Sequence, residues 1–127
     1  YKNSPEIVST RYEVSSTYFG ASHPFQNFSS VTYDLVQEKQ LSLSDIFNTT
    51  DYLKIISSFA HQSLAKKLLT DELSDYSKSI VMHSIRFGTE PKPENFKVWN
   101  LTEQGILLSF PTYQVASYVE GPQEVLI

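Results

Sequence analysis

Two stretches in the first third of the chain alternate apolar and polar residues with a period of two. In the segment 7–19 the even positions include the apolar residues Val8, Tyr12, Val14 and Tyr18. The positions between them are mostly polar, a pattern typical of a half-buried strand. The segment 28–36 repeats the alternation. The two segments predict a β-hairpin whose connection, Gly20–Gln26, contains His23.

Further along the chain, apolar residues recur at every third or fourth position. Ser42 and Asp45 are spaced as a capping pair for a single helical turn. In the segment 51–69 an apolar stripe predicts a helix with one face against the sheet. That face is expected to contain Leu53, Ile56, Ala60 and Leu64.

The segment 70–88 predicts a second helix. Leu73, Tyr76 and Ile80 fall in helical register on it. Gly88 is a suitable residue for its end, because glycine adopts helix-terminating backbone conformations readily. The residues around Ile80 also suit a strand, so the periodicity leaves that alternative open.

The last third of the chain returns to strand-like patterns. Pro93 is placed where a one-turn helix can start, because proline fits the first helical position. The segment 96–110 predicts a hairpin whose turn, Thr102–Gly105, has a glycine available for a positive φ. Pro111 ends the second strand of this hairpin, and residues 124–127 form one more strand.

Strands, then helices, then strands predict an α+β fold: a mainly antiparallel sheet with one or two helices packed on one face. The chain has 127 residues, of which 40% are hydrophobic and 13% aromatic. This length and composition suit one globular domain over residues 1–127. A start at Tyr1 without methionine fits a mature exported protein, or a domain taken from a longer one.

Charge and cysteine content exclude several classes of function. The net charge of −4 gives nucleic acid no overall electrostatic attraction, so we expect no nucleic-acid partner. With no cysteine, the chain has no disulfide, thiolate metal site or cysteine nucleophile. No apolar run approaches the length that spans a bilayer, so we expect no membrane span in this chain.

The sequence offers no recognisable catalytic or metal site. Its three histidines, His23, His61 and His83, lie in separate segments without the spacing of a metal site. No Gly-x-Ser-x-Gly motif is present, and four glycines do not make a phosphate loop. Five acidic residues are candidates for acid–base catalysis, but capping and solubility are the simpler interpretation of their positions: Asp34, Asp45, Asp71, Glu72 and Asp75. We therefore predict no catalytic residue, no metal and no cofactor.

Aromatic residues are the more informative surplus, with eight Tyr, eight Phe and one Trp. Tyr113 and Tyr118 bracket the stretch YQVASY directly after a predicted strand. Tyrosine has an apolar ring and a polar tip, which suit both a packed sheet edge and a recognition surface. Packing is the simpler interpretation, and a binding role for the two tyrosines is the functional one.

His23 lies between a glycine and a proline in the connection of the first hairpin. The proline biases His23 toward an extended backbone on a short, stiff segment. A neutral imidazole donates from one nitrogen and accepts at the other, so we expect His23 to tie the loop to a carbonyl, a tyrosine or Asp34. This would order Pro24 and Phe25 as an exposed edge for a partner. Direct contact of His23 with a ligand is the alternative.

Taken together, the motifs YFGASHP, TYDL, LSLSDIF, ENF and GILLSFPTYQVASYVEGPQEV resemble a bacterial domain family of unknown function. This family forms the C-terminal extracytoplasmic part of RsiV, the lysozyme-sensing anti-sigma factor, and also occurs in some peptidoglycan deacetylases. The resemblance runs from about Ile7 to Ile127. The chain departs from it where GASH replaces a double glycine before the histidine, and where VQEKQ lacks a glycine.

The resemblance implies an exported or membrane-anchored bacterial protein, so we expect an extracytoplasmic place: periplasmic, secreted or on the cell surface. A membrane anchor would lie outside this chain. The resemblance also implies a non-enzymatic binding or sensing domain whose partner is a protein, such as lysozyme, or a peptidoglycan-type ligand. The alternative is an accessory or catalytic domain of an enzyme that modifies peptidoglycan.

Overall fold

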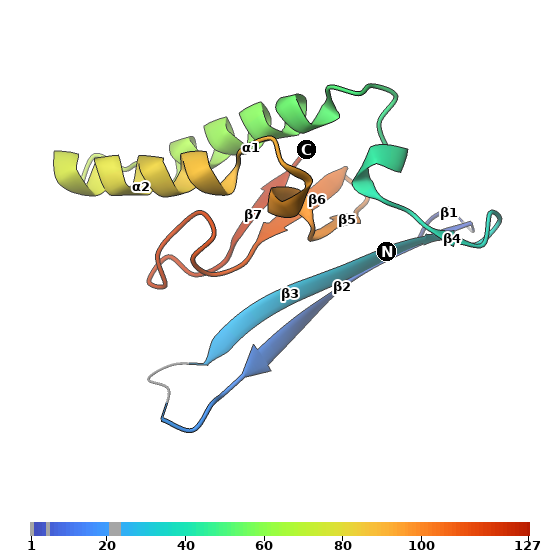
Figure 1. The fold of residues 1–127 in the computed structure, drawn as a ribbon, viewed down its shortest axis with the longest axis horizontal. Helices are drawn as coiled ribbons and strands as arrows, with labels where there is room; N and C mark the ends of the chain where they lie inside the picture. Colours follow the sequence, from blue (N-terminus) through green and yellow to red (C-terminus); the bar gives the residue numbers. More distant parts are fainter. Residues whose placement is uncertain (1, 5, 21–23) are drawn as a thin grey trace.

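The computed structural model describes residues 2–4, 6–20 and 24–127. The elements are arranged in three layers. The helices lie on one side, a short sheet in the middle and a long hairpin on the other side (Figure 1). The elements in chain order are β1 Lys2–Ser4, β2 Ile7–Ser16, β3 Phe25–Asp34, β4 Lys39–Gln40, η1 Leu43–Asp45, α1 Tyr52–Leu68, α2 Asp75–Gly88, η2 Pro93–Phe96, β5 Trp99–Leu101, β6 Ile106–Phe110 and β7 Gln123–Leu126.

The α+β class and the antiparallel pairing predicted from the sequence are confirmed, but the described strands form two sheets. One sheet has the order β1-β2-β3-β4 and the other the order β5-β6-β7. The sheets stay separate because β5 crosses the inner face of the hairpin and bonds to its side chains. The backbone N–H of Trp99 donates to Ser30 Oγ at 3.0 Å, and that of Leu101 donates to Ser9 Oγ at 2.8 Å.

The hairpin β2–β3 has the predicted period of two, but its polar side is the buried one. Ser9 and Thr32 are paired across the strands and fully or almost fully buried. Tyr12 and Val14, on the opposite face, keep 57% and 52% of their surface exposed. An apolar alternation normally marks the face toward the core. Here the hydroxyl face is buried, because it supplies the acceptors that the N–H groups of β5 require.

Arg11 makes a second connection between the hairpin and the short sheet. Its Nη1 donates to Ser109 Oγ at 2.9 Å, and its guanidinium forms an ion pair with Glu124. The guanidinium also lies 4.9 Å from the centroid of the Phe28 ring, in cation–π contact. Polar side chains therefore fix the hairpin against both β6 and β7.

Helix α1 packs on the short sheet with the predicted face. Ile56, Ala60 and Leu64 are fully buried, and Leu53 packs against the same core. The other side of this core comes from the short sheet and from η2, including Phe96, Leu108 and Phe110. The predicted turn at Ser42 and Asp45 forms as η1, whose Leu43 joins the core.

Helix α2 forms within the segment where the second helix was predicted, but the residues that defined its register are not those that it buries. Tyr76 and Ile80 are exposed, Tyr76 by 77%, whereas Ile85 and Gly88 are buried. Figure 1 shows that the first turns of α2 extend beyond the short sheet, and the helix meets the core from Val81 onward. The absence of a side chain at Gly88 permits this approach, since a Cβ there would lie 2.1 Å from the carbonyl oxygen of Gln114.

The C-terminal elements form as the sequence predicts. The one-turn helix η2 starts at Pro93, and β5 and β6 pair as a hairpin across the turn before Gly105. Gly105 has a φ of +148° and lies against the carbonyl of Ile127, so its place also requires the absence of a side chain. Strand β7 follows Gly121 and Pro122 and pairs with β6.

Candidate functional site: a groove along β3

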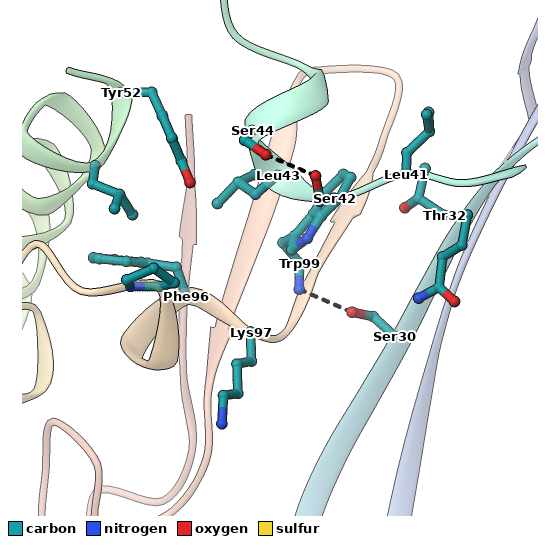
Figure 2. A pocket seen from close by; sticks show the side chains of 13 residues that line it. Ser30, Thr32, Leu41, Ser42, Leu43, Ser44, Tyr52, Phe96, Lys97 and Trp99 are labelled. Carbon is teal, nitrogen blue, oxygen red and sulfur yellow. Dashed lines mark hydrogen bonds between the residues drawn. The ribbon is translucent and has the colours of Figure 1, made fainter. Parts of the chain in front are cut away.

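A hollow of about 440 Å³ opens between β3, η1, η2 and the start of α1 (Figure 2). This volume falls within the range of small-ligand sites. Strands β4 and β5 contribute to the hollow as well, so its described lining comes from six elements. Its lining consists of Ser30, Thr32, Gln40, Leu41, Ser42, Leu43, Ser44, Tyr52, Leu53, Pro93, Phe96, Lys97 and Trp99.

One rim of this first hollow is a row of hydroxyl groups on η1. Ser42 Oγ lies 2.7 Å from Ser44 Oγ. The carboxylate of Asp45 accepts from Ser42 Oγ at 2.5 Å and from the Ser42 backbone N–H at 2.7 Å. These two bonds, with a third from Lys39, lower the pKa of Asp45 to about 2. Asp45 therefore acts as the cap that the sequence predicts, and it holds the rim in place.

Three aromatic residues, Tyr52, Phe96 and Trp99, form the aromatic wall of the hollow. Tyr52 stacks on Phe47 with 5.5 Å between the ring centroids, and Phe96 packs edge-on against Phe110 at 6.1 Å. Trp99 is held by the bond from its backbone N–H to Ser30. These contacts tie the aromatic wall to the core, so the shape of the hollow is set before any ligand arrives.

Two polar groups of the first hollow are available for a ligand. Within the described part of the chain, neither the Tyr52 hydroxyl nor the Gln40 side-chain amide has a hydrogen-bond partner. Figure 2 shows the Tyr52 hydroxyl directed into the space bordered by Leu43 and Phe96. A phenol and an amide both donate and accept hydrogen bonds. The hollow can therefore bond to hydroxyl and amide groups of a ligand, whether these act as donors or as acceptors.

A second hollow, of about 340 Å³, continues along β3 toward Asn27. It shares Ser30 and Lys97 with the first hollow, and together we call them the β3 groove. The complete lining of the second hollow among the described residues is Asn27, Phe28, Ser29, Ser30, Glu94, Lys97, Val98, Pro111 and Gln114. The groove is therefore elongated, and it follows a strand that rises about 3.3 Å per residue.

The ionisable side chains in the described lining of the β3 groove are Tyr52, Glu94 and Lys97. Its described lining contains no histidine, and its single carboxylate is Glu94. Across residues 2–4, 6–20 and 24–127, no three His, Asp or Glu side chains gather to hold a metal ion. In the same residues, no helix has the length and apolar content needed to cross a membrane.

The tyrosines proposed from the sequence come together in the loop between β6 and β7. The rings of Tyr113 and Tyr118 lie 6.0 Å apart, and Tyr113 is 63% exposed. Tyr113 has a φ of +73°, which is unusual for a bulky residue. The next residue, Gln114, anchors the loop by donating to the carbonyls of Gly88 and Asn95. Gln114 also lines the β3 groove, so the tyrosine pair lies near one end of it.

The other predicted site residues are in the first hairpin. His23 lies outside the described residues, Pro24 is exposed, and the backbone of Phe25 begins β3. The predicted contact of His23 with Asp34 therefore stays a prediction. The whole of β3 separates Asp34 from Pro24, and the Asp34 carboxylate accepts from the backbone N–H groups of Val36 and Gln37 in a turn.

Sequence reasoning missed the β3 groove itself. Tyr52, Phe96, Lys97 and Trp99 come from three segments of the chain, and each one alone is ordinary. The serine and threonine residues of segment 29–32 were a signal for the groove. The usual rule that the apolar face of a strand is buried places these polar residues in solvent. A strand with hydroxyls on one side is compatible with a buried polar face when another backbone edge needs acceptors.

The fold defines a small α+β domain with two antiparallel sheets below a helix pair. Residues 44–127 match the family described as Protein of unknown function (DUF3298). The chain belongs to this family, which confirms the resemblance stated from the motifs.

Two further proteins are similar to the chain. It is 32% identical over 127 residues to Peptidoglycan-N-acetylmuramic acid deacetylase PdaC of Bacillus subtilis (strain 168). The match covers 99% of this chain and 25% of that protein, so the chain spans about a quarter of this relative. A solved structure of a DUF3298 member from Bacteroides fragilis NCTC 9343 superposes with a TM-score of 0.67 at 23% identity. It covers 96% of this chain and 45% of that chain, and supports the fold.

Proposed function

We propose that this is an extracytoplasmic accessory domain that binds the bacterial cell wall, with a stretch of its polysaccharide in the β3 groove. The observation that carries the proposal is the lining of the first hollow. The lining combines hydroxyl groups on η1 with aromatic side chains, and the Tyr52 hydroxyl and Gln40 amide have no partner within the described residues. The similarity to a segment of PdaC, whose name states an action on peptidoglycan, supports a cell-wall context.

A sugar polymer suits this lining for two physical reasons. Sugar rings carry hydroxyl and acetamido groups, which pair with side chains that donate and accept. The same rings have C–H faces that pack on aromatic side chains, of which the half-buried Tyr52 is within reach. The elongated groove also has space for more than one ring, because each hollow has the volume of a small-ligand site.

A protein partner is the second candidate, and Tyr113 and Tyr118 favour it. Exposed tyrosines that are held in place are common contacts in protein interfaces, because they bury a large area at little entropic cost. We propose this surface as the place where a lysozyme-like protein would be recognised, as the family resemblance implies. His23, Pro24 and Phe25 stay predicted contacts for the same kind of partner.

The single tryptophan gives a direct test, since Trp99 lines the groove. Residues 1–127 are mixed with insoluble peptidoglycan and sedimented, and soluble glycan fragments are titrated against Trp99 fluorescence. Ser44→Met places a longer side chain in the first hollow. It is expected to lower the affinity for peptidoglycan, measured by sedimentation, about tenfold. The matched control Ser79→Met, at an exposed position of α2, is expected to leave it unchanged.

Two outcomes would contradict the proposal. The first is a wild-type domain that stays in the supernatant and shows no change in Trp99 fluorescence. The second is equal binding by the Ser44→Met and Ser79→Met variants. Binding to lysozyme that is lost on Tyr113→Ala, with no binding to glycan, would favour the protein partner instead.

A further inference from the structure

One charged side chain stands out in the β3 groove. Lys97 is the only charged residue in the described lining of the first hollow, and it lines the second hollow as well. The chain as a whole carries a net charge of −4, so the positive charge of the lysine in its groove is opposite in sign to the net charge. Figure 2 shows Lys97 extending away from Tyr52 and η1.

Lys97 has no ionic partner in the described part of the chain. Four ion pairs form among these residues, and each involves another cation: Arg11 with Glu124, Lys39 with Asp45, Lys54 with Asp51 and Lys92 with Glu90. Glu94 lines the second hollow together with Lys97, but no ion pair joins them. The ammonium group is thus exposed and free to meet an anion from solution.

We propose that Lys97 makes the β3 groove selective for a sugar that bears a free carboxylate, as N-acetylmuramic acid does where no peptide is attached, over a neutral sugar of the same backbone. This inference rests on the proposed function. The carboxylate is expected beside the Lys97 ammonium, where the two hollows meet. The sugar ring next to the carboxylate then lies near Ser30, which both hollows share.

The selectivity has a characteristic dependence on salt. An ion pair between solvent-exposed groups weakens as ionic strength rises, whereas ring packing and neutral hydrogen bonds are affected little. Added salt is therefore expected to reduce binding of the anionic sugar toward that of the neutral one. The expected preference at low salt is about fivefold to tenfold, the scale of one partly shielded charge-assisted hydrogen bond.

The test compares two soluble tetrasaccharides with the same β-1,4-linked backbone by titration of Trp99 fluorescence. One contains only N-acetylglucosamine, and the other alternates N-acetylglucosamine with N-acetylmuramic acid without peptide. Lys97→Met removes the charge and keeps the length, Lys97→Arg keeps the charge, and Lys66→Met removes an exposed charge at the end of α1. The preference is expected to disappear only in Lys97→Met.

The outcomes separate the two proposals. Equal binding of both sugars by the wild type, or a preference that survives in Lys97→Met, overturns the role of Lys97 and leaves the glycan groove standing. Binding of neither sugar overturns both. A preference lost in Lys66→Met as well as in Lys97→Met would mean that overall charge causes it, and the role of Lys97 would be rejected.

Discussion

The hydroxyl of Ser9 and the backbone N–H of Leu101 are joined by a hydrogen bond of 2.8 Å across 92 positions of the chain. Ser9 Oγ also lies 2.7 Å from Thr32 Oγ1, on the neighbouring strand. This relationship fastens the hairpin β2–β3 to the short sheet, next to Thr32, which lines the first hollow.

Ser9→Ala is expected to destabilise the domain by about 1–3 kcal/mol, because it leaves the buried N–H of Leu101 without this acceptor. Ser15→Ala, at an exposed position of the same strand, is expected to change stability by less than about 0.5 kcal/mol. Urea unfolding followed by Trp99 fluorescence measures both. Equal midpoints for the two variants would show that the bond adds nothing to stability.

Ile56→Ala is expected to cost roughly 2–5 kcal/mol, because Ile56 is fully buried between α1 and the core. Lys66→Ala, on the exposed side of the same helix, is expected to cost little. Thermal unfolding followed by circular dichroism gives the comparison. Similar melting temperatures would mean that the buried face of α1 is assigned wrongly.

Gly88→Ala is expected to destabilise the domain by about 1–3 kcal/mol, although alanine favours helices, because the new Cβ would collide with the carbonyl of Gln114. The control is Ser79→Ala on the same helix, where the side chain is exposed and the change is expected to be neutral or slightly stabilising. A Gly88→Ala variant as stable as the wild type would show that α2 can move away from the loop of Gln114.

The stability of the domain is expected to fall between about pH 4 and pH 2 in part through Asp45. Its pKa is lowered from 3.8 to about 2 by the bonds from Ser42 and Lys39. A lowered pKa in the folded state contributes stability above the unfolded pKa, and this contribution is lost as pH falls through the folded one. The gap in melting temperature between wild type and Asp45→Asn should therefore narrow from pH 5 to pH 2. A gap that is constant with pH would contradict this role.

His23 stays a prediction from the sequence. If it braces its loop, His23→Ala lowers stability and His23→Asn restores part of it, because the amide keeps one donor and one acceptor. Thermal unfolding and binding to a partner are measured for both variants. Full stability with loss of binding would instead make His23 a contact residue.

Local patterns were sufficient for most of the secondary structure of this protein, although they did not predict the short strands β1 and β4. The alternation in segments 7–19 and 28–36, the stripe through Ile56 and Leu64, and the turn before Gly105 each depend on residues close in sequence. The capping role of Asp45 was also predicted, because Ser42 lies three positions away. Periodicity and turn chemistry act over a few residues, which is why these elements are found where the sequence places them.

Tertiary structure alone decided which faces of the first hairpin and of α2 are buried and where the groove lies. An alternating strand has two faces, and only the need of β5 for hydrogen-bond acceptors selected the face with Ser9 and Thr32. In the same way, the position of α2 beyond the short sheet exposed Tyr76 and buried Ile85. The groove brings Ser30, Tyr52 and Lys97 together by long-range packing, which depends on the whole chain and leaves no periodic trace in the sequence.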